Sequence, residues 1–148
     1  MSSAVVIDAI RTPIARADAR TGWFRDVRSD ELSAGLITEL VSRTGIDPAL
    51  IEDVRWGCVQ QQGEQGYDIA RIAVLMAGLP IETGGVTINR NCASSLQAIN
   101  DSAMSIMAGC ENVQIVGGVE HMQHIPMTKD YDPAPGLFRK YSEAIMHM

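Results

Sequence analysis

The sequence has few cysteines and no long apolar run, and both shortages exclude classes of protein. Its three cysteines, Cys58, Cys92 and Cys110, are an odd number without C-x-x-C spacing, so they suggest neither a disulfide framework nor a zinc site. No apolar stretch approaches the roughly 20 residues of a membrane span, and the first residues lack the pattern of a secretory signal. We therefore expect a cytoplasmic protein in reducing surroundings, with no membrane span and no metal site.

Basic residues are also scarce. The 148 residues carry 12 lysines and arginines against 18 aspartates and glutamates, which gives a net charge of −6, and no basic block is present. Binding to nucleic acid requires clustered positive charge, so we expect no nucleic-acid partner. The apolar content of 46% is ordinary for a single globular domain with a real core.

The sequence alternates regularly between strand-like and helix-like segments. Apolar and β-branched runs are typical of buried parallel strands, and apolar residues three and four positions apart indicate helices. The predicted strands are 4–10, 54–59, 86–88 and 113–116, and the predicted helices are 29–44, 69–76 and a segment from Cys92 to about residue 108. This βαβαβαβ order predicts an α/β fold with a mostly parallel sheet and helices on its faces.

The alternating pattern ends near residue 120, which suggests a division of the chain. We expect residues 1–120 to form a core half-domain and 121–148 to begin a truncated loop subdomain, because the latter segment has no clear period. The helix after Cys92 has small residues around most of its circumference. We therefore expect a buried central helix, which a chain of this length cannot enclose without a missing half or another subunit.

Cys92 is the most informative residue. The β-branched run Val86–Ile88 precedes it and the small-residue helix follows it, so its thiol lies at or near a helix N-terminus. The unpaired amides and the dipole of a helix start favour thiolate, the nucleophilic form of cysteine. Cysteine is also a common small core residue, so from the residues alone both a covalent nucleophile and a packing role stay open.

Five blocks of the sequence match one family in the family's order. The blocks are Val5–Pro13, Trp56–Gln61, Glu64–Arg71, Val86–Cys92 and Val116–Met122. With them the chain resembles the N-terminal part of the thiolases, and it looks most like the bacterial 3-ketoacyl-CoA thiolases of fatty-acid β-oxidation. No block is decisive alone, but together they are highly specific. The resemblance implies a thiolase-like layered fold.

The resemblance also implies an activity. Cys92 falls on the family's nucleophile, which takes an acyl group from 3-ketoacyl-CoA and releases acetyl-CoA, and its backbone N–H contributes to an oxyanion hole. Coenzyme A is then a co-substrate, and no cofactor is bound permanently. The implied partners are acyl-CoA, further copies in a homodimer or tetramer, and a hydratase/dehydrogenase subunit. Ala93 departs mildly from the glycine that many members carry.

The larger departure is length, since thiolases are more than twice as long as this chain. The family's activating histidine, second cysteine and water-orienting asparagine belong to later motifs that these residues do not contain. His121 and His124 are expected to be structural rather than replacements, and Cys58 and Cys110 are expected to be packing residues. Met148 is a candidate substrate-pocket residue, because a His-Met pair in the family lies near the bound thioester.

Three alternatives to a degradative thiolase stay open. A biosynthetic acetoacetyl-CoA thiolase and a ketoacyl synthase also place a nucleophilic cysteine before small residues. The block Gly117–Met122 and the early position of Cys92 favour a thiolase over a synthase. A non-catalytic subunit with the thiolase half-fold is the alternative from a different class.

Overall fold

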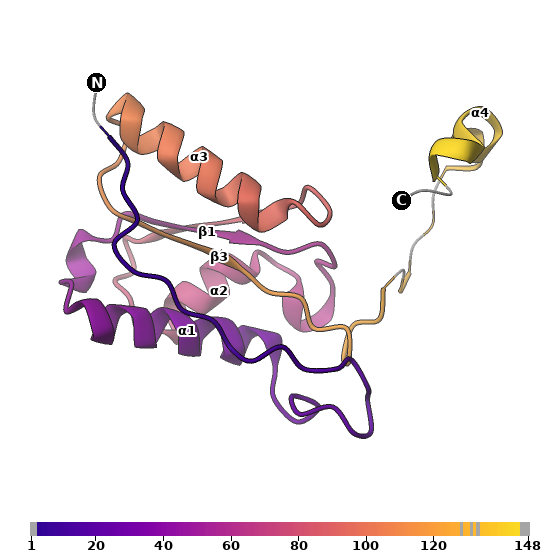
Figure 1. Cartoon of the computed structure of the whole chain (residues 1–148), viewed down its shortest axis with the longest axis horizontal. Coiled ribbons are helices and arrows are strands. Elements are labelled where there is room, and N and C mark those ends of the chain that lie inside the picture. Colours follow the sequence, from indigo (N-terminus) through magenta and orange to yellow (C-terminus); the bar gives the residue numbers. More distant parts are fainter. Residues whose placement is uncertain (1–2, 128, 131, 133, 146–148) are drawn as a thin grey trace.

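The structure is a computed structural model that describes residues 3–127, 129–130, 132 and 134–145. Its helices and strands follow one another in nearly the predicted order (Figure 1). The elements are α1 (Ser29–Thr44), η1 (Pro48–Leu50), β1 (Asp53–Gly57), η2 (Gly63–Gln65), α2 (Ile69–Met76), β2 (Gly84–Ile88), α3 (Ser94–Ala108), β3 (Gln114–Gly118) and α4 (Pro135–Ile145). The predicted α/β class is therefore confirmed.

The core is a three-stranded parallel sheet in the order β2-β1-β3. Asp53 of β1 lies opposite Gly84 and Gln114, and Gly57 lies opposite Ile88 and Gly118. Helix α2 packs on β1 and β2 and supports α1, whereas α3 packs on the other face, mainly over β1 and β3 (Figure 1). All three strands therefore end at the same edge of the sheet, and the chain leaves β2 there to enter α3.

The buried apolar residues lie mainly between the sheet and the pair α1–α2. They include Ile37, Val54, Trp56, Ile69 and Val74. The indole Nε1 of Trp56 donates a hydrogen bond of 3.1 Å to Ser33 Oγ, so the one polar atom of this large ring is satisfied inside the core. In α2 the buried residues are Ile69, Ala70, Ala73 and Val74, so this helix turns one apolar face to the core.

The predicted strand at residues 4–10 is wrong. This segment forms no ladder, and Val5, Val6 and Ile7 are 75%, 81% and 75% exposed. A strand requires a neighbouring strand for its backbone hydrogen bonds, and within the described residues the three strands of the sheet pair only with one another. The apolar run predicted a buried strand, but an apolar run does not indicate which strand would lie beside it.

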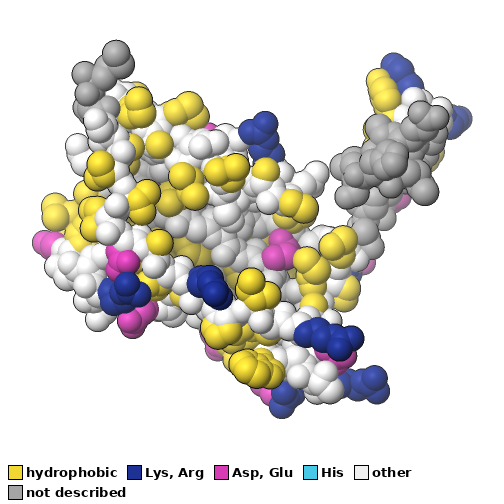
Figure 2. All heavy atoms as spheres, viewed as in Figure 1, with side chains coloured by type: hydrophobic (Ala, Val, Ile, Leu, Met, Phe, Trp, Pro, Cys, Tyr) yellow, Lys and Arg dark blue, Asp and Glu magenta, His cyan; other side chains and the backbone are white. Residues whose placement is uncertain are grey.

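The outer side of α3 is also apolar and uncovered. Leu96, Ile99, Met104 and Met107 are each 44% to 60% exposed, and Figure 2 shows hydrophobic side chains gathered over this helix and the N-terminal segment. Ala98 and Ser102, on the side that faces the sheet, are buried. One side of α3 is therefore packed as predicted for a central helix, and the other side is exposed.

The chain beyond β3 has two parts. Residues 121–127 return to the core, where His121 and Ile125 are buried. Helix α4, which was not predicted because residues 121–148 have no clear period, stands apart from the core in Figure 1. The division expected at residue 120 stays a prediction. Among the described residues, no helix combines the length and the apolar character needed to cross a bilayer.

Candidate active site

Cys92 lies in the turn between β2 and α3, two residues before the helix begins. Its side chain is exposed and its thiol is free. The sequence placed it at the start of this helix, and the structure agrees. Cys110 is exposed beyond the opposite end of α3, and Cys58 is buried directly after β1. The three thiols therefore occupy very different surroundings.

The turn that carries Cys92 is held by its own side chains. Ser94 Oγ accepts a hydrogen bond from the Arg90 amide at 2.8 Å and donates one to the Asn91 carbonyl at 2.6 Å. Asn89 Oδ1 accepts from the Asn91 amide at 3.0 Å. Asn91 has a positive φ of 49°, which asparagine tolerates better than most residues. Cys92 is thus held in place although it is exposed.

Two glycines allow the first turn of α3 to lie directly on the sheet. A Cβ atom on Gly57 would come within 2.5 Å of the Ser95 nitrogen and 2.7 Å of the Ser94 carbonyl carbon. A Cβ on Gly118 would collide with Ser95 Oγ and come within 2.6 Å of the Gly57 oxygen. The absence of side chains at the ends of β1 and β3 therefore sets how close Cys92 lies to the sheet.

A pocket of about 300 Å³ opens beside Cys92. Its lining comes from the exits of β1 and β3 and from the start of α3, and it includes Cys58, Cys92, Ser95, Glu120 and Met122. Ligands of parallel α/β sheets commonly bind at the carboxyl ends of the strands. The pocket is therefore where the fold class leads one to expect a substrate.

Cys58 lines the same pocket but is a poor nucleophile. Burial, together with the negative charge of Glu120, raises the pKa of the Cys58 thiol to about 12, although hydrogen bonds from its neighbours act in the opposite direction. Its thiol is 3.3 Å from the donating Nε2 of Gln65. A thiol with such a pKa carries almost no thiolate near neutrality, which agrees with the predicted packing role.

The contact between Gln65 and Glu120 was not predicted. Both were part of matching blocks, but nothing in those blocks indicates that the two side chains meet. In the structure, Gln65 Nε2 donates to Glu120 Oε1 at 3.0 Å, and Glu120 Oε2 accepts from the Val59 amide at 2.9 Å. The carboxylate that lines the pocket is therefore held by the turn after β1.

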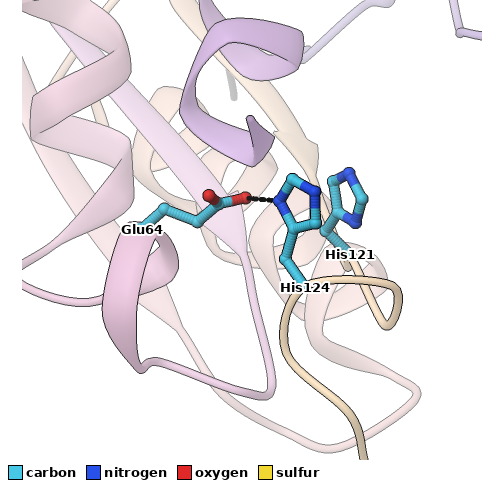
Figure 3. A group of neighbouring side chains, drawn as sticks. All are labelled: Glu64, His121 and His124. Carbon is cyan, nitrogen blue, oxygen red and sulfur yellow. Dashed lines mark hydrogen bonds and ion pairs between the residues drawn. The ribbon is translucent and has the colours of Figure 1, made fainter. Parts of the chain in front are cut away.

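Glu64, His121 and His124 form a second cluster, beside the loop that precedes α1 (Figure 3). His124 Nδ1 lies 2.9 Å from Glu64 Oε1, and its Nε2 lies 2.7 Å from the Arg25 carbonyl oxygen. Both partners are acceptors, so the protonated ring, in which both nitrogens donate, satisfies both contacts. The Arg25 carbonyl, and then Glu64, raise the pKa of His124.

Ligand geometry argues against a metal at this cluster. The His121 and His124 rings stack with centroids 4.1 Å apart and planes inclined by only 14° (Figure 3). A metal ion lies in the plane of each imidazole that binds it, and two nearly parallel stacked rings cannot both point a nitrogen at one ion. Both nitrogens of His124 also already face an oxygen acceptor, Glu64 Oε1 and the Arg25 carbonyl.

The cluster instead fastens the loop before α1. His121 Nε2 donates to the carbonyls of Phe24 and Val27 at 3.1 and 2.9 Å, and Gln123 Nε2 donates to the Asp18 carbonyl at 3.0 Å. Glu64 accepts from the backbone amide of Ser29 at 2.8 Å. Burial opposes ionisation of Glu64, but the hydrogen bonds from Ser29 and His124 outweigh it and lower the pKa of Glu64.

The other predicted site residue, Met148, lies outside the described residues. Of the predicted candidates, the structure therefore brings Cys92 to a pocket and gives the two histidines hydrogen-bond partners. We call the contacts of Glu64, His121, Gln123 and His124 with the loop before α1 the loop clamp. It adds Gln65 and Glu120, which sequence reasoning did not select.

Comparisons with known proteins agree with the earlier resemblance. Residues 4–148 match the family model of the thiolase N-terminal domain. A 3-ketoacyl-CoA thiolase of Vibrio cholerae serotype O1 (strain ATCC 39541 / Classical Ogawa 395 / O395) is 48% identical over 145 residues, and one of Shewanella baltica (strain OS155 / ATCC BAA-1091) is 52% identical over the same length. Each alignment covers 97% of this chain and 37% of the relative. The chain therefore spans little more than a third of the length of these curated relatives.

Proposed function

The chain belongs to the thiolase family, and on that premise we propose that it carries the nucleophilic half of a 3-ketoacyl-CoA thiolase active site. The observation that carries the proposal is the exposed Cys92 thiol, which borders a pocket at the carboxyl edge of the sheet. The relatives are named 3-ketoacyl-CoA thiolases, and that name supplies the substrate class.

In the proposed reaction, the Cys92 thiolate attacks the 3-keto carbon of the substrate. The bond between C2 and C3 then breaks, the acyl group stays on sulfur as a thioester, and C2 leaves as the enolate of acetyl-CoA, which takes up a proton. The thiol of a second coenzyme A attacks the acyl-cysteine, forms the shortened acyl-CoA and returns Cys92 to its thiol form. Coenzyme A is therefore a co-substrate, and no permanently bound cofactor is required.

The backbone N–H of Cys92 is proposed to stabilise the oxyanion that forms when the carbonyl is attacked. An amide that is already fixed in place stabilises developing charge without reorganisation, and one such donor contributes about 100-fold to 1,000-fold in rate. The hydrogen bonds that hold residues 89–94 support this role, because they fix the backbone around Cys92.

The described pocket residues do not include the proton donor that the family carries in its later motifs. The titratable residues of the pocket besides Cys92 are Cys58, whose thiol is hydrogen-bonded to Gln65, and Glu120, whose carboxylate accepts backbone and amide hydrogen bonds. We therefore expect residues 1–148 alone to show no multiple turnover with acetoacetyl-CoA, although they can still take an acyl group onto Cys92. Release of acetyl-CoA in repeated cycles, measured by chromatography, would contradict this expectation.

The proposal includes partners and location. We propose acyl-CoA and coenzyme A as small-molecule partners. We also propose that the protein assembles as a homodimer or tetramer and associates with a hydratase/dehydrogenase subunit. The exposed apolar side of α3 supports assembly, because such a surface is costly in water. Free cysteines support a reducing cytoplasmic location.

Acyl transfer to Cys92 is the direct test. The chain is incubated with acetyl-CoA, and we expect one acetyl group on Cys92 by peptide mass mapping, with one coenzyme A released. Cys92→Ser should abolish the adduct, because serine is far less acidic than cysteine. Cys110→Ser, a change at the other exposed thiol, is the matched control and should leave the adduct intact. Equal labelling of Cys92 and Cys110 would contradict the proposal.

The alternatives predict different outcomes. A biosynthetic acetoacetyl-CoA thiolase runs the same chemistry toward condensation, and a ketoacyl synthase requires a malonyl thioester that loses carbon dioxide. A non-catalytic subunit would take no acyl group onto Cys92. Acylation of Cys92 followed by return of the acyl group to added coenzyme A therefore favours a thiolase over the other two classes.

A further inference from the structure

The side chain of Gln65 is completely buried, and both ends of its amide are hydrogen-bonded. The nitrogen donates to the Gln60 carbonyl at 2.7 Å and to Glu120 Oε1 at 3.0 Å. The oxygen accepts from the His121 backbone amide at 2.7 Å. One amide therefore joins the turn after β1 to the segment after β3. Burial of an amide is unfavourable unless it is hydrogen-bonded, so Gln65 depends on these partners.

The connection continues from Glu120 to the turn that carries Cys92. The Glu120 carboxylate accepts from the Val59 amide at 2.9 Å, and the Val59 carbonyl accepts from Asn89 Nδ2 at 3.0 Å. Asn89 Oδ1 in turn accepts from the Asn91 amide at 3.0 Å. An unbroken series of hydrogen bonds therefore leads from the buried amide to the residue that precedes Cys92.

We propose that Gln65 is a positioning residue for acyl transfer at Cys92. This inference rests on the proposed function, in which Cys92 is the nucleophile. Gln65 does not line the pocket, and it acts through Glu120, which does. By holding the Glu120 carboxylate against the turn after β1, Gln65 fixes the distance between Glu120 in the pocket wall and the turn that carries Cys92. Such alignment matters because a misplacement of about 1 Å can cost about 100-fold in rate.

The site requires an amide at this position. The side chain must donate to the Glu120 carboxylate and accept from the His121 amide, and a glutamine does both without carrying a charge. A leucine would do neither. A glutamate would accept from His121 but would place a second carboxylate against Glu120. The other titratable group in contact with Gln65 is the Cys58 thiol, which stays protonated across the neutral range because its pKa is about 12.

These differences define the experiment. Acyl transfer from acetyl-CoA to Cys92 is timed by mass spectrometry for the wild-type chain, Gln65→Leu and Gln65→Glu. We expect Gln65→Leu to be slower than wild type by about tenfold at every pH. The rate of Gln65→Glu is compared with that of wild type at the same pH. We expect it to be about tenfold lower at about pH 8 and close to wild type at about pH 5, where the two facing carboxyls share one proton and a donor is restored.

Thr83→Val is the matched control. Thr83 is 2% exposed and donates from Oγ1 to the Ile51 carbonyl at 2.9 Å, and it lies beside the first residue of β2, at the end of the sheet opposite Cys92. The variant loses a buried hydrogen bond of the same kind without affecting the connection to Cys92. We expect its transfer rate to stay within about twofold of wild type, because distant sites act independently.

Two results would overturn the proposal: rates within about twofold of wild type in both Gln65 variants, or an equal loss in Thr83→Val. If Gln65→Leu does not fold, the recovery of Gln65→Glu at low pH decides, since a purely structural defect would not depend on the protonation of the two carboxyl groups.

If the wild-type chain takes no acetyl group, the proposed function fails. The positioning role is then judged from the rate at which Cys92 reacts with 2,2′-dithiodipyridine, divided by the rate at which Cys110 reacts. That ratio should fall about threefold in Gln65→Leu and not in Thr83→Val, and an unchanged ratio in both refutes the role.

Discussion

The Cys92 turn and the N-terminal apolar segment are both exposed, but the turn is held by several hydrogen bonds within itself, whereas the segment has, within the described residues, one side-chain tie to the core, from Asp8 to Arg43 at 3.0 Å. Residues 89–94 are tied by short-range hydrogen bonds from Asn89 and Ser94, and glycines at the sheet edge set the approach of α3. Residues 4–10 are mostly apolar, form no strand and pair with none. The contrast teaches that neighbouring residues can fix a reactive side chain, whereas an apolar surface depends on partners from elsewhere.

Thiol labelling sharpens this contrast most. We expect iodoacetamide to modify Cys92 first, Cys110 later and Cys58 last, with Cys58 slower than Cys92 by about 100-fold or more. Cys58 is 1% exposed, and burial and the charge of Glu120 raise its pKa to about 12. Timed peptide mapping of the native chain measures all three rates. Labelling of Cys58 or Cys110 ahead of Cys92 would argue against a specially presented thiol in the Cys92 turn.

The next test removes the close approach of α3 to the sheet. Gly57→Ala places a methyl group within 2.5 Å of the Ser95 nitrogen, and the backbone cannot yield without moving the first turn of α3. We expect the free energy of unfolding to fall by about 2 kcal/mol. Gly35→Ala is the control, because no atom lies within 4 Å of its Cβ position, and it should gain about 0.5 to 1 kcal/mol in helix α1. Urea unfolding compares the two, and equal effects would contradict the steric argument.

The uncovered side of α3 should make the chain associate when it is expressed alone. Leu96 and Met104 are 60% and 58% exposed. The double variant Leu96→Gln, Met104→Gln should weaken association while the free energy of unfolding changes by about 0.5 kcal/mol or less, since neither side chain lies in the core. Sedimentation at several concentrations measures association. A wild-type chain that is monomeric at all of them would show that this surface does not drive assembly.

The smallest expected effect is a pH dependence of the loop clamp. The pKa of His124 is raised in the fold, so its contribution is complete below the ordinary histidine pKa of 6.5 and is lost as pH rises through the folded value. The charges that face it are Glu64, which favours the imidazolium, and Arg28, which opposes it. The pKa of Glu64 is lowered, so its contribution is lost only as pH falls through that lower value.

We therefore expect His124→Gln to be less stable than wild type, and the difference to be larger at about pH 6 than at about pH 9. The difference should not exceed about 1 kcal/mol, because the His124 side chain is partly exposed to solvent. Urea unfolding at the two pH values measures it. A difference that grows with rising pH would show that the neutral ring makes the clamp.

Local signals in the sequence predicted most of the fold. Gly45 and Gly109 adopt positive φ values of 65° and 76° directly after α1 and α3, as glycines that end helices do. Asp47 Oδ1 accepts from the Ala49 amide, as expected of a cap before a first-turn proline. These features depend on residues a few positions apart, so the sequence carries them directly.

The features that sequence reasoning missed depend on distant contacts. Gln65 and Glu120 are 55 positions apart, and neither has a local pattern that indicates the other. The strand predicted at 4–10 was wrong for the same reason, because apolar character does not name a neighbour. The strand-turn-helix pattern did locate Cys92 at the β2–α3 turn, and its role as nucleophile stays a prediction.

The loop clamp has a consequence for altering this protein by design. His121, Gln123 and His124 all bind carbonyl groups of the loop at residues 18–27, and a carbonyl is the same whichever side chain accompanies it. Gly22 is restricted, because a Cβ there would collide with the Gln123 amide, and so is Asp18, whose carboxylate accepts from the Arg20 and Thr21 amides at 2.9 Å. Trp23, which is 79% exposed, is therefore a suitable attachment point for a dye or an affinity handle that leaves the anchoring of the loop unchanged.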